Sequence, residues 1–281
     1  MNAMCGWFGI TTQAHYQMKR RLATRQDTNA QVVDMVKRIR QKHKRIGARK
    51  LQVMLADDLA AAGIQIGRDR LFDLLRRENL LVMPKRRQSR TTWAGLWRCE
   101  NLLTNASVTR PNQVWVSDIT YIETEGKLSY LTLVTDLFSR RVIGYDLCQT
   151  LAVEGALRAF NMAVRQAGGR QAIGGLIHHS DHGIQYVCQA YRDRLRQCGV
   201  KLSMGEVGNC YDNAVAERVN GILKIEYGLD ERFVSHRQAL QATHEAVWLY
   251  NHERPHLSLN YNRPYNIYIK YAKSANSINY V

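Results

Sequence analysis

Three acidic residues have the types and the surroundings of a site for phosphodiester chemistry: Asp118, Asp181 and Glu217. Asp118 lies in the alternating run VWVSDITYIE, Asp181 ends the short apolar segment GGLIHHSD, and Glu217 begins the helical pattern of DNAVAERVNGILKIEY. Carboxylate oxygens, without Cys or His among the ligands, are what Mg²⁺ or Mn²⁺ prefers. Two such ions can activate a nucleophile and stabilise the leaving oxygen of an in-line displacement. The acids therefore predict a metal-dependent site with two Mg²⁺ (or Mn²⁺) ions.

Each acid also has an ordinary structural interpretation. Asp118 could form a salt bridge, Asp181 could cap a turn, and Glu217 could stabilise the start of its helix through the macrodipole. The period of two places Asp118 on the same strand face as Val114 and Val116. An unpaired carboxylate is costly to bury on an apolar face. Taken together, in this order, the three acids favour the catalytic interpretation.

Other polar residues near the acids receive secondary roles. Asp136 is a rival acid, but two arginines follow it at a predicted strand end, so we interpret it as structural. His179 and His182 flank Asp181. We expect them to support that acid by hydrogen bonds rather than to bind metal, and a plain surface role remains open.

The elements that must position these residues follow from residue 113 onward. Apolar residues alternate in three successive segments, which predicts an antiparallel meander: QVWVSDITYIE, LSYLTLVTDLF and RRVIGYDLCQT. Helical and strand patterns then alternate through VEGALRAFNMAVRQA, GLIHHSD, CQAYRDRLRQCG, KLSM and the segment that carries Glu217. A last helix is predicted at SHRQALQATHEAVWLYNH, followed by turn-rich sequence. This order predicts an α/β fold of the RNase H-like type, a mixed five-stranded sheet with flanking helices.

Charge is concentrated near the N-terminus. The 281 residues carry a net charge of +16, and residues 1–100 hold 21 Lys and Arg against 8 Asp and Glu. Such an excess predicts a polyanionic partner, most simply DNA. Apolar runs fall short of the ~18 residues needed to cross a bilayer, so no membrane partner is expected. Six scattered cysteines without CxxC indicate reduced thiols. We expect a cytoplasmic protein that associates with the nucleoid when bound to DNA.

Helical patterns at residues 29–44, 47–61 and 68–79 precede the predicted sheet, with a few weaker helical turns at 2–22. A helix, a Gly-containing turn and a helix on a basic background resemble a helix-turn-helix, although an ordinary three-helix bundle explains the pattern equally well. The candidate DNA contacts here are Arg49, Lys50, Arg68 and Arg70. The predicted organisation is a helical DNA-binding region at 1–83, a basic linker at 84–110, a catalytic core at 111–270 and a tail at 271–281.

Several long segments resemble the insertion-sequence-3 family of bacterial transposases, in particular their second-frame product. The segments are WVSDITYI (115–122), VTDLFSRRVIGY (134–145), HSDHGIQY (179–186), GNCYDNAVAERVNGILKIEY (208–227), YNHERPHLSLNY (250–261) and, nearer the N-terminus, IGARKLQ (46–52). The resemblance implies a retroviral-integrase-like DDE core in which Asp118, Asp181 and Glu217 are the catalytic, metal-binding triad. It also implies cleavage of the 3′ strand at insertion-sequence ends and transfer to target DNA. The implied partners are the upstream-frame product and further copies of the chain during synapsis.

The helix of Glu217 holds further candidates. Lys224 follows Glu217 by seven residues, about 10 Å along a helix, and the resemblance implies a DNA contact for it. Asn213 is a candidate DNA contact or helix cap, and Asn220 shares the helix. Glu206 departs from the family, whose members often carry a basic residue there. Residues 1–45 also lack a sustained heptad repeat, so one interpretation is that this chain is the catalytic half only.

Three other functions compete with transposition. A nuclease without strand transfer would need no large basic region. A retroviral-type integrase would need a compact zinc module, for which residues 1–100 offer only His15, His43, Cys5 and Cys99. The non-enzymatic alternatives are a DNA-binding regulator and a decayed element whose core is inert, and three intact acids disfavour decay.

Overall fold

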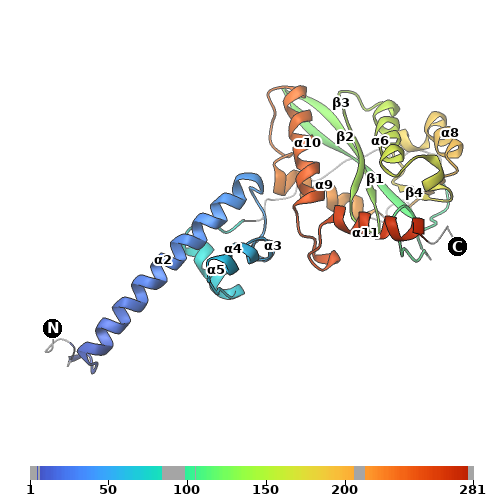
Figure 1. The fold of residues 1–281 in the computed structure, drawn as a ribbon. Coiled ribbons are helices and arrows are strands. Elements are labelled where there is room, and N and C mark those ends of the chain that lie inside the picture. The colour runs from blue at the N-terminus through green and yellow to red at the C-terminus, as the bar shows by residue number, and fades with distance from the viewer. Residues whose placement is uncertain (1–4, 6, 84–98, 105, 206–212, 278–281) are drawn as a thin grey trace. The chain divides into compact units, whose positions relative to one another are not determined.

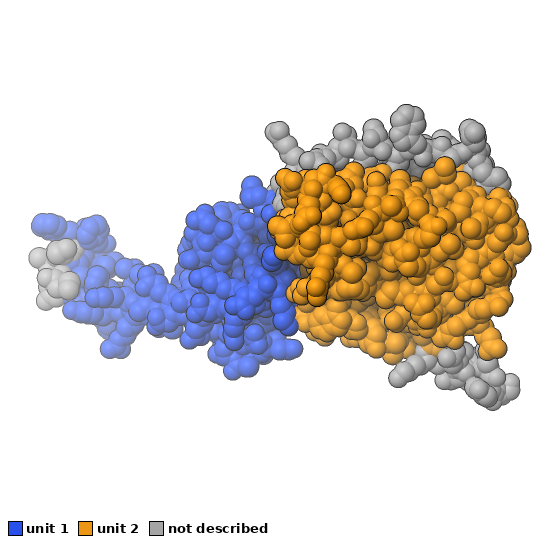
Figure 2. Space-filling model, turned by 90° about the horizontal axis from the view of Figure 1, so that it is seen from above, with its two compact units in different colours: residues 1–84 blue, residues 85–281 orange. Residues whose placement is uncertain are grey.

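The computed structural model describes residues 5, 7–83, 99–104, 106–205 and 213–277. The chain divides into two compact units, residues 1–84 and 85–281 (Figure 2). Along these described ranges, no helix is long and apolar enough to cross a membrane.

The N-terminal unit is helical. Its helices are α2 (Thr12–Lys42), α3 (Ala48–Met54), α4 (Ala56–Ala61) and α5 (Arg68–Arg77). Apolar residues of the last three helices pack against the C-terminal half of α2, where Val32 and Val36 are fully buried. Helices with apolar residues on one face must bury that face against another element, and this packing gives the unit its own core.

Two helix boundaries in this unit differ from the prediction. The first helix begins at Thr12 rather than at residue 29, and the side chain of Thr11 caps it by accepting a hydrogen bond from Ala14 N at 3.1 Å. Residues 12–42 contain no Gly or Pro to stop a helix. The predicted helix 47–61 is interrupted at Leu55, which is the C-cap of α3 and the N-cap of α4.

The C-terminal unit is built on a five-stranded sheet. Its strands are β1 (Val114–Thr124), β2 (Lys127–Asp136), β3 (Val142–Cys148), β4 (Ile177–Ser180) and β5 (Lys201–Met204), in the spatial order β3-β2-β1-β4-β5. The first three strands pair antiparallel, whereas β4 and β5 run parallel to β1. The prediction of an RNase H-like mixed five-stranded sheet is therefore confirmed.

Helices cover both faces of the sheet (Figure 1). They are α6 (Val153–Gln166), α7 (Ile184–Val187), α8 (Gln189–Gln197), α9 (Ala214–Tyr227), α10 (His236–His252) and α11 (Pro264–Ser277). One core cluster joins Trp115 of β1 to Phe160 of α6 and Tyr191 of α8. The other joins strand residues such as Leu133 to α9 and α10. Helix α11 was not predicted, and it runs across residue 271, where the sequence indicated a tail.

Gly144 of β3 lies directly under α6. A Cβ atom built on it would lie 2.2 Å from Ala159 O and 2.8 Å from Ala163 N. We expect Gly144→Ala to lower the free energy of unfolding by about 3 kcal/mol or more, because backbone atoms must move to relieve the overlap. Gly174→Ala, with nothing within 4 Å, is the control. Equal urea midpoints for the two variants would contradict the prediction.

Candidate active site

Strand β1 presents different residues to its two faces. Trp115 packs into the cluster that contains α6 and α8, whereas Val114 and Val116 pack with Ala216 of α9. Asp118 belongs to the α9 face by alternation, and it is only 6% exposed. The predicted cost of placing a carboxylate on this apolar face is therefore real, and the contacts of Asp118 must offset it.

Asp118 and Asp181 lie at the same level of neighbouring strands. The parallel pairing of β1 with β4 ends with Ser117 opposite Ser180; Asp118 is the next residue of β1, and Asp181 is the first residue after β4. Neighbouring strands are about 4.8 Å apart. Asp181 is half-buried, and its Oδ1 accepts a hydrogen bond from Gly183 N at 3.1 Å. The end of β4 thus brings together two acids that are 63 positions apart in the chain.

Both carboxylate oxygens of Asp118 accept hydrogen bonds. Oδ1 accepts from Ile119 N at 2.9 Å, and Oδ2 accepts from Asn220 Nδ2 of α9 at 2.7 Å. The Asn220 amide is neutral, so it orients the carboxylate without adding a charge of its own. The sequence showed that Asn220 shares the helix of Glu217, but it gave no sign of this contact with Asp118.

Helix α9 presents a polar stripe to β1. Asn213, Glu217, Asn220 and Lys224 are spaced by four, three and four residues, which is the spacing of one helical face. Asn213 Nδ2 donates to Ser117 O at 3.1 Å, so both asparagines on this stripe bind β1. Glu217 lies between them with an exposed side chain, and Lys224 is half-buried. Asn213, a predicted DNA contact, therefore already has its amide engaged inside the protein.

The histidines of β4 and the following loop are buried. His179, predicted to support Asp181, shares a hydrogen bond of 2.9 Å between its Nδ1 and Ser203 Oγ, and His182 is also buried. His178, which the sequence did not single out, pairs its Nε2 with the hydroxyl of Tyr191 at 2.9 Å. Burial, and secondarily the neighbouring His179, lower the pKa of His178 to about 3. His178 is therefore a neutral core residue.

Asp136 has the contacts of a structural acid. It is fully buried, and it accepts hydrogen bonds from Asn112 N at 2.8 Å, Ser139 N at 2.8 Å and Ser139 Oγ at 2.6 Å. Burial raises the pKa of this carboxyl group, against the opposing effect of those hydrogen bonds and of Arg140. These contacts hold the β2–β3 turn and support the structural interpretation.

The donor chemistry of the three acids fits a hard divalent cation, because every side-chain donor is a carboxylate oxygen. The three carboxylates are not arranged closely enough to coordinate one ion together. Within the parts of the chain that the structure describes, no group of three or more His, Cys, Asp or Glu is close enough to hold a metal ion. The sheet brings Asp118 and Asp181 to one level, and the exposed Glu217 side chain is the component with freedom to adjust.

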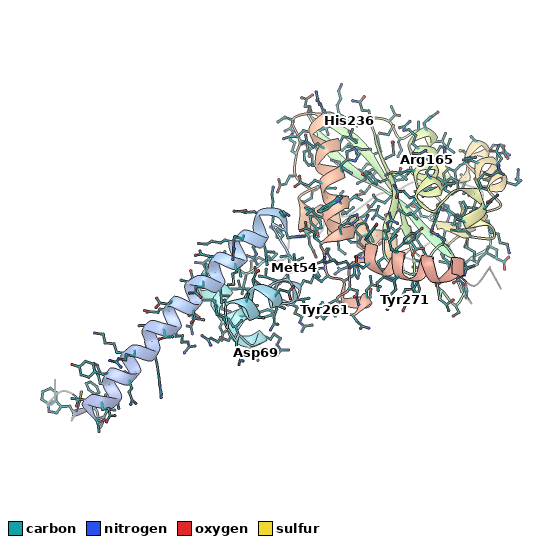
Figure 3. All side chains as sticks on the ribbon, viewed as in Figure 1. Met54, Asp69, Arg165, His236, Tyr261 and Tyr271 are labelled. Atoms are coloured by element: carbon teal, nitrogen blue, oxygen red, sulfur yellow. The ribbon has the colours of Figure 1, made fainter. Side chains whose placement is uncertain are left out.

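The candidate DNA contacts of the N-terminal unit lie on α3 and α5. Arg49 is exposed and Lys50 is half-buried on α3. On α5, Arg68 is exposed and Arg70 is half-buried. Arg68 Nε lies 2.8 Å from Oδ1 of Asp69, which is one of the residues labelled in Figure 3. This exposed pair offsets part of the positive charge that Arg68 would offer to a phosphate. Glu206, where the sequence departs from the family it resembles, lies outside the described residues.

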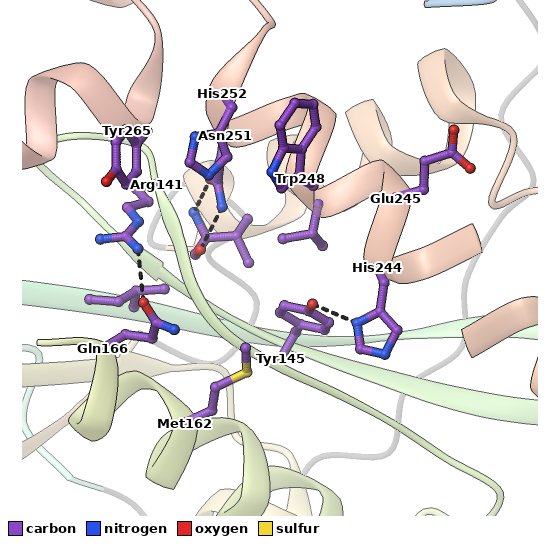
Figure 4. A pocket seen from close by; sticks show the side chains of 13 residues that line it. Arg141, Tyr145, Met162, Gln166, His244, Glu245, Trp248, Asn251, His252 and Tyr265 are labelled. Atoms are coloured by element: carbon purple, nitrogen blue, oxygen red, sulfur yellow. Dashed lines mark hydrogen bonds between the residues drawn. The ribbon is translucent and has the colours of Figure 1, made fainter. Parts of the chain in front are cut away.

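A separate cavity of about 630 Å³ lies beside β3, between α6 and α10 (Figure 4). Its wall includes Arg141, Tyr145, Trp248, His252 and Tyr265. The ring of Trp248 stacks on that of His252, and the Arg141 guanidinium lies 5.1 Å from the ring centre of Tyr265. None of the three acids lines this cavity, so it is not part of the acidic site.

Comparison with known proteins adds independent information. A family model described as "Integrase core domain" matches residues 108–210, and a second model with the same description matches residues 198–264. The chain is 34% identical to "Insertion element IS600 uncharacterized 31 kDa protein" of Shigella sonnei, over 91% of this chain and 94% of that protein. It is 32% identical to "Transposase InsF for insertion sequence IS3A" of Escherichia coli K12, over 86% and 84%. Among solved structures, the catalytic core domain of HTLV-2 integrase in complex with magnesium is 21% identical, with a TM-score of 0.45, over 57% of this chain and 97% of that one.

Proposed function

This chain belongs to the insertion-sequence-3 family of bacterial transposases, with an integrase-like core, and from that membership we propose that it cuts and joins DNA by the DDE reaction. In this reaction the 3′ strand at an element end is cleaved, and the freed 3′-hydroxyl attacks a phosphodiester of target DNA. The observation that carries the proposal is the pairing of Ser117 with Ser180, which puts Asp118 and Asp181 at one level of neighbouring chain segments, with Asp118 bound to Asn220 of α9.

Asp118, Asp181 and Glu217 would hold Mg²⁺ (or Mn²⁺), with two ions as the expected number. When bound, such ions supply activation of the attacking oxygen and stabilisation of the leaving oxygen. Asn220 keeps the Asp118 carboxylate oriented through its 2.7 Å hydrogen bond. Lys224, seven residues beyond Glu217 on the same stripe, is the residue we propose for a flanking phosphate.

The remaining partners are also proposals. DNA ends and target DNA are the substrates, and the N-terminal unit is the candidate reader of the ends. The upstream-frame product would act as a fusion partner or as a separate chain. Joining two element ends requires at least two copies of the chain during synapsis. The place of action would then be the cytoplasm, on the nucleoid.

The deciding experiment uses the purified full chain, Mg²⁺ and a labelled duplex that carries the element's own end, with and without the upstream-frame product. Joined products in either arm support the transposase. Cleavage without joining would favour a plain nuclease, and DNA binding without any reaction would favour a regulator.

The salt dependence of end binding tests the N-terminal unit. We expect Arg49→Ala and Arg70→Ala each to weaken binding and to reduce the slope of log K against log[salt] by about 0.9, because each removes one phosphate contact. Fluorescence anisotropy on end DNA measures both quantities. Arg196→Ala is the control, because Arg196 is an exposed residue of the other unit that pairs with Asp193. Slopes equal to that of the parent would refute these DNA contacts.

A further inference from the structure

A buried chain of hydrogen bonds crosses the sheet next to Asp118. Ser117 Oγ donates to Leu133 O of β2 at 2.8 Å, and it also lies 2.8 Å from the hydroxyl of Tyr186 in α7. A serine hydroxyl has one proton, and a carbonyl oxygen can only accept. The Tyr186 hydroxyl must therefore donate to Ser117 Oγ. Both side chains are fully buried, so no water can take over this bond.

The same tyrosine is tied closely to Asp181. Gly183 N donates to Asp181 Oδ1 at 3.1 Å, and Gly183 O accepts from Tyr186 N at 2.9 Å. The turn is tight, because a Cβ atom on Gly183 would lie 3.0 Å from Asp181 Oδ1 and 3.4 Å from a ring carbon of Tyr186. A shift of the Tyr186 ring would therefore displace Gly183, and through Gly183 it would move the Asp181 carboxylate.

Ser117 also binds the helix of the third acid. Its backbone oxygen accepts a hydrogen bond from Asn213, the N-cap residue of α9, and its hydroxyl accepts one from Tyr186 of α7. Ser117 thus contacts α7, which follows Asp181, and the start of α9, which carries Glu217. The residue after Ser117 is Asp118 itself.

We propose that the hydrogen bond from Tyr186 to Ser117 sets the position of Asp181 relative to Asp118, and that these two residues are positioning residues of the metal site. The inference rests on the proposed function, because it takes the acids as the metal ligands. Neither side chain reaches the substrate. Strand β4 has only four residues, Ile177–Ser180, so the sheet alone holds the Asp181 turn weakly. The Tyr186 bond supplies a second attachment of this turn to β1.

Two tyrosines of the same core give a matched test. Tyr186→Phe removes the hydroxyl that donates to Ser117, and Tyr191→Phe removes an equally buried hydroxyl that bonds His178 instead. Mg²⁺ affinity of the full chain is measured by titration calorimetry, and folding is checked by thermal unfolding. We expect Tyr186→Phe to weaken Mg²⁺ binding about 10-fold or more, as loss of a residue that orients a ligand does. Tyr191→Phe should remain within about two-fold of the parent. Equal affinities for the two variants would overturn the inference.

Ser117→Ala provides an independent variant of the same bond. Ser117→Ala alone and the double variant Ser117→Ala/Tyr186→Phe should weaken Mg²⁺ binding to a similar extent. Either substitution breaks the same hydrogen bond, so the second one adds no further loss. Effects that multiply in the double variant would count against the link.

Asp181→Asn separates this inference from the proposed function. If Asp181→Asn leaves Mg²⁺ affinity unchanged, the acid assignment fails and the positioning role falls with it. If Asp181→Asn abolishes binding while Tyr186→Phe retains parental affinity, the acids stand and only the positioning role is refuted.

Discussion

Asp118→Asn should reduce strand joining by about 1,000-fold or more while leaving the fold intact, which corresponds to about 4 kcal/mol of lost transition-state stabilisation. The reason lies in what the substitution keeps and removes. Asparagine has nearly the shape of aspartate, and its single amide oxygen can keep one of the two hydrogen bonds that the carboxylate accepts from Ile119 N and Asn220 Nδ2. It lacks the negative charge that a divalent cation requires. The site would therefore largely keep its shape but lose one of the carboxylates that bind the metal.

The fold of the variant is checked by urea unfolding in metal-free buffer, because a loss of joining reports on the metal site only if the chain still folds. Asp193→Asn, which alters an exposed carboxylate on α8, is the control for joining activity. Joining by Asp118→Asn at the control rate would refute the acidic site.

Arg254→Met should lower the free energy of unfolding by about 3–5 kcal/mol. Arg254 is 1% exposed, and it makes two hydrogen bonds with Glu226, from Nε to Oε2 at 2.8 Å and from Nη2 to Oε1 at 2.9 Å. Removing the guanidinium takes two charge-assisted hydrogen bonds from the largely buried Glu226 carboxylate, and the loss of those bonds causes most of the destabilisation. Urea unfolding of the full chain measures it.

Two further variants check that explanation. Arg254→Met combined with Glu226→Leu should recover part of the lost stability, because replacing both partners also removes the carboxylate that lost those bonds. Arg196→Met, which breaks an exposed pair with Asp193, should cost less than about 1 kcal/mol. A cost for Arg254→Met as small as that for Arg196→Met would contradict the prediction. Arg254 lies in the YNHERPH segment, and the result would identify that segment as structural.

The strands and the acids could be predicted because their signals are local. Period-two alternation around Asp118 fixed both its strand and its face, and the short apolar run before Asp181 marked a strand end. Helix α11 escaped prediction because its tyrosines and asparagines are weak helix formers. Pro264 at its first position was the available signal. The helix is stabilised in part by tertiary packing, with Tyr268 buried against the core.

The contacts that arrange the acids could not be predicted in this way. Asn220 is 102 positions from Asp118, and Tyr186 is 69 positions from Ser117. Neither contact produces a repeating pattern in the sequence, because each hydrogen bond joins one side chain to one partner far away in the chain. A sequence predicts which residues share a face of one helix or strand. The partner on another element depends on how the two elements are aligned along their axes, and only the folded chain fixes that alignment.

The two asparagine contacts of α9 have a consequence for insertions and deletions. Successive helix residues are rotated by about 100° and advanced by about 1.5 Å, and the residue after Glu217 is Arg218. If α9 turned and advanced by one residue against β1, the guanidinium of Arg218 would take the position of the Glu217 carboxylate, and that position would attract anions instead of cations. Asn213 and Asn220, one on each side of Glu217 in the sequence, oppose that shift. A deletion of one residue between Asn213 and Glu217, with the Asn213 contact retained, would place Arg218 at the Glu217 position and reverse the sign of the charge there.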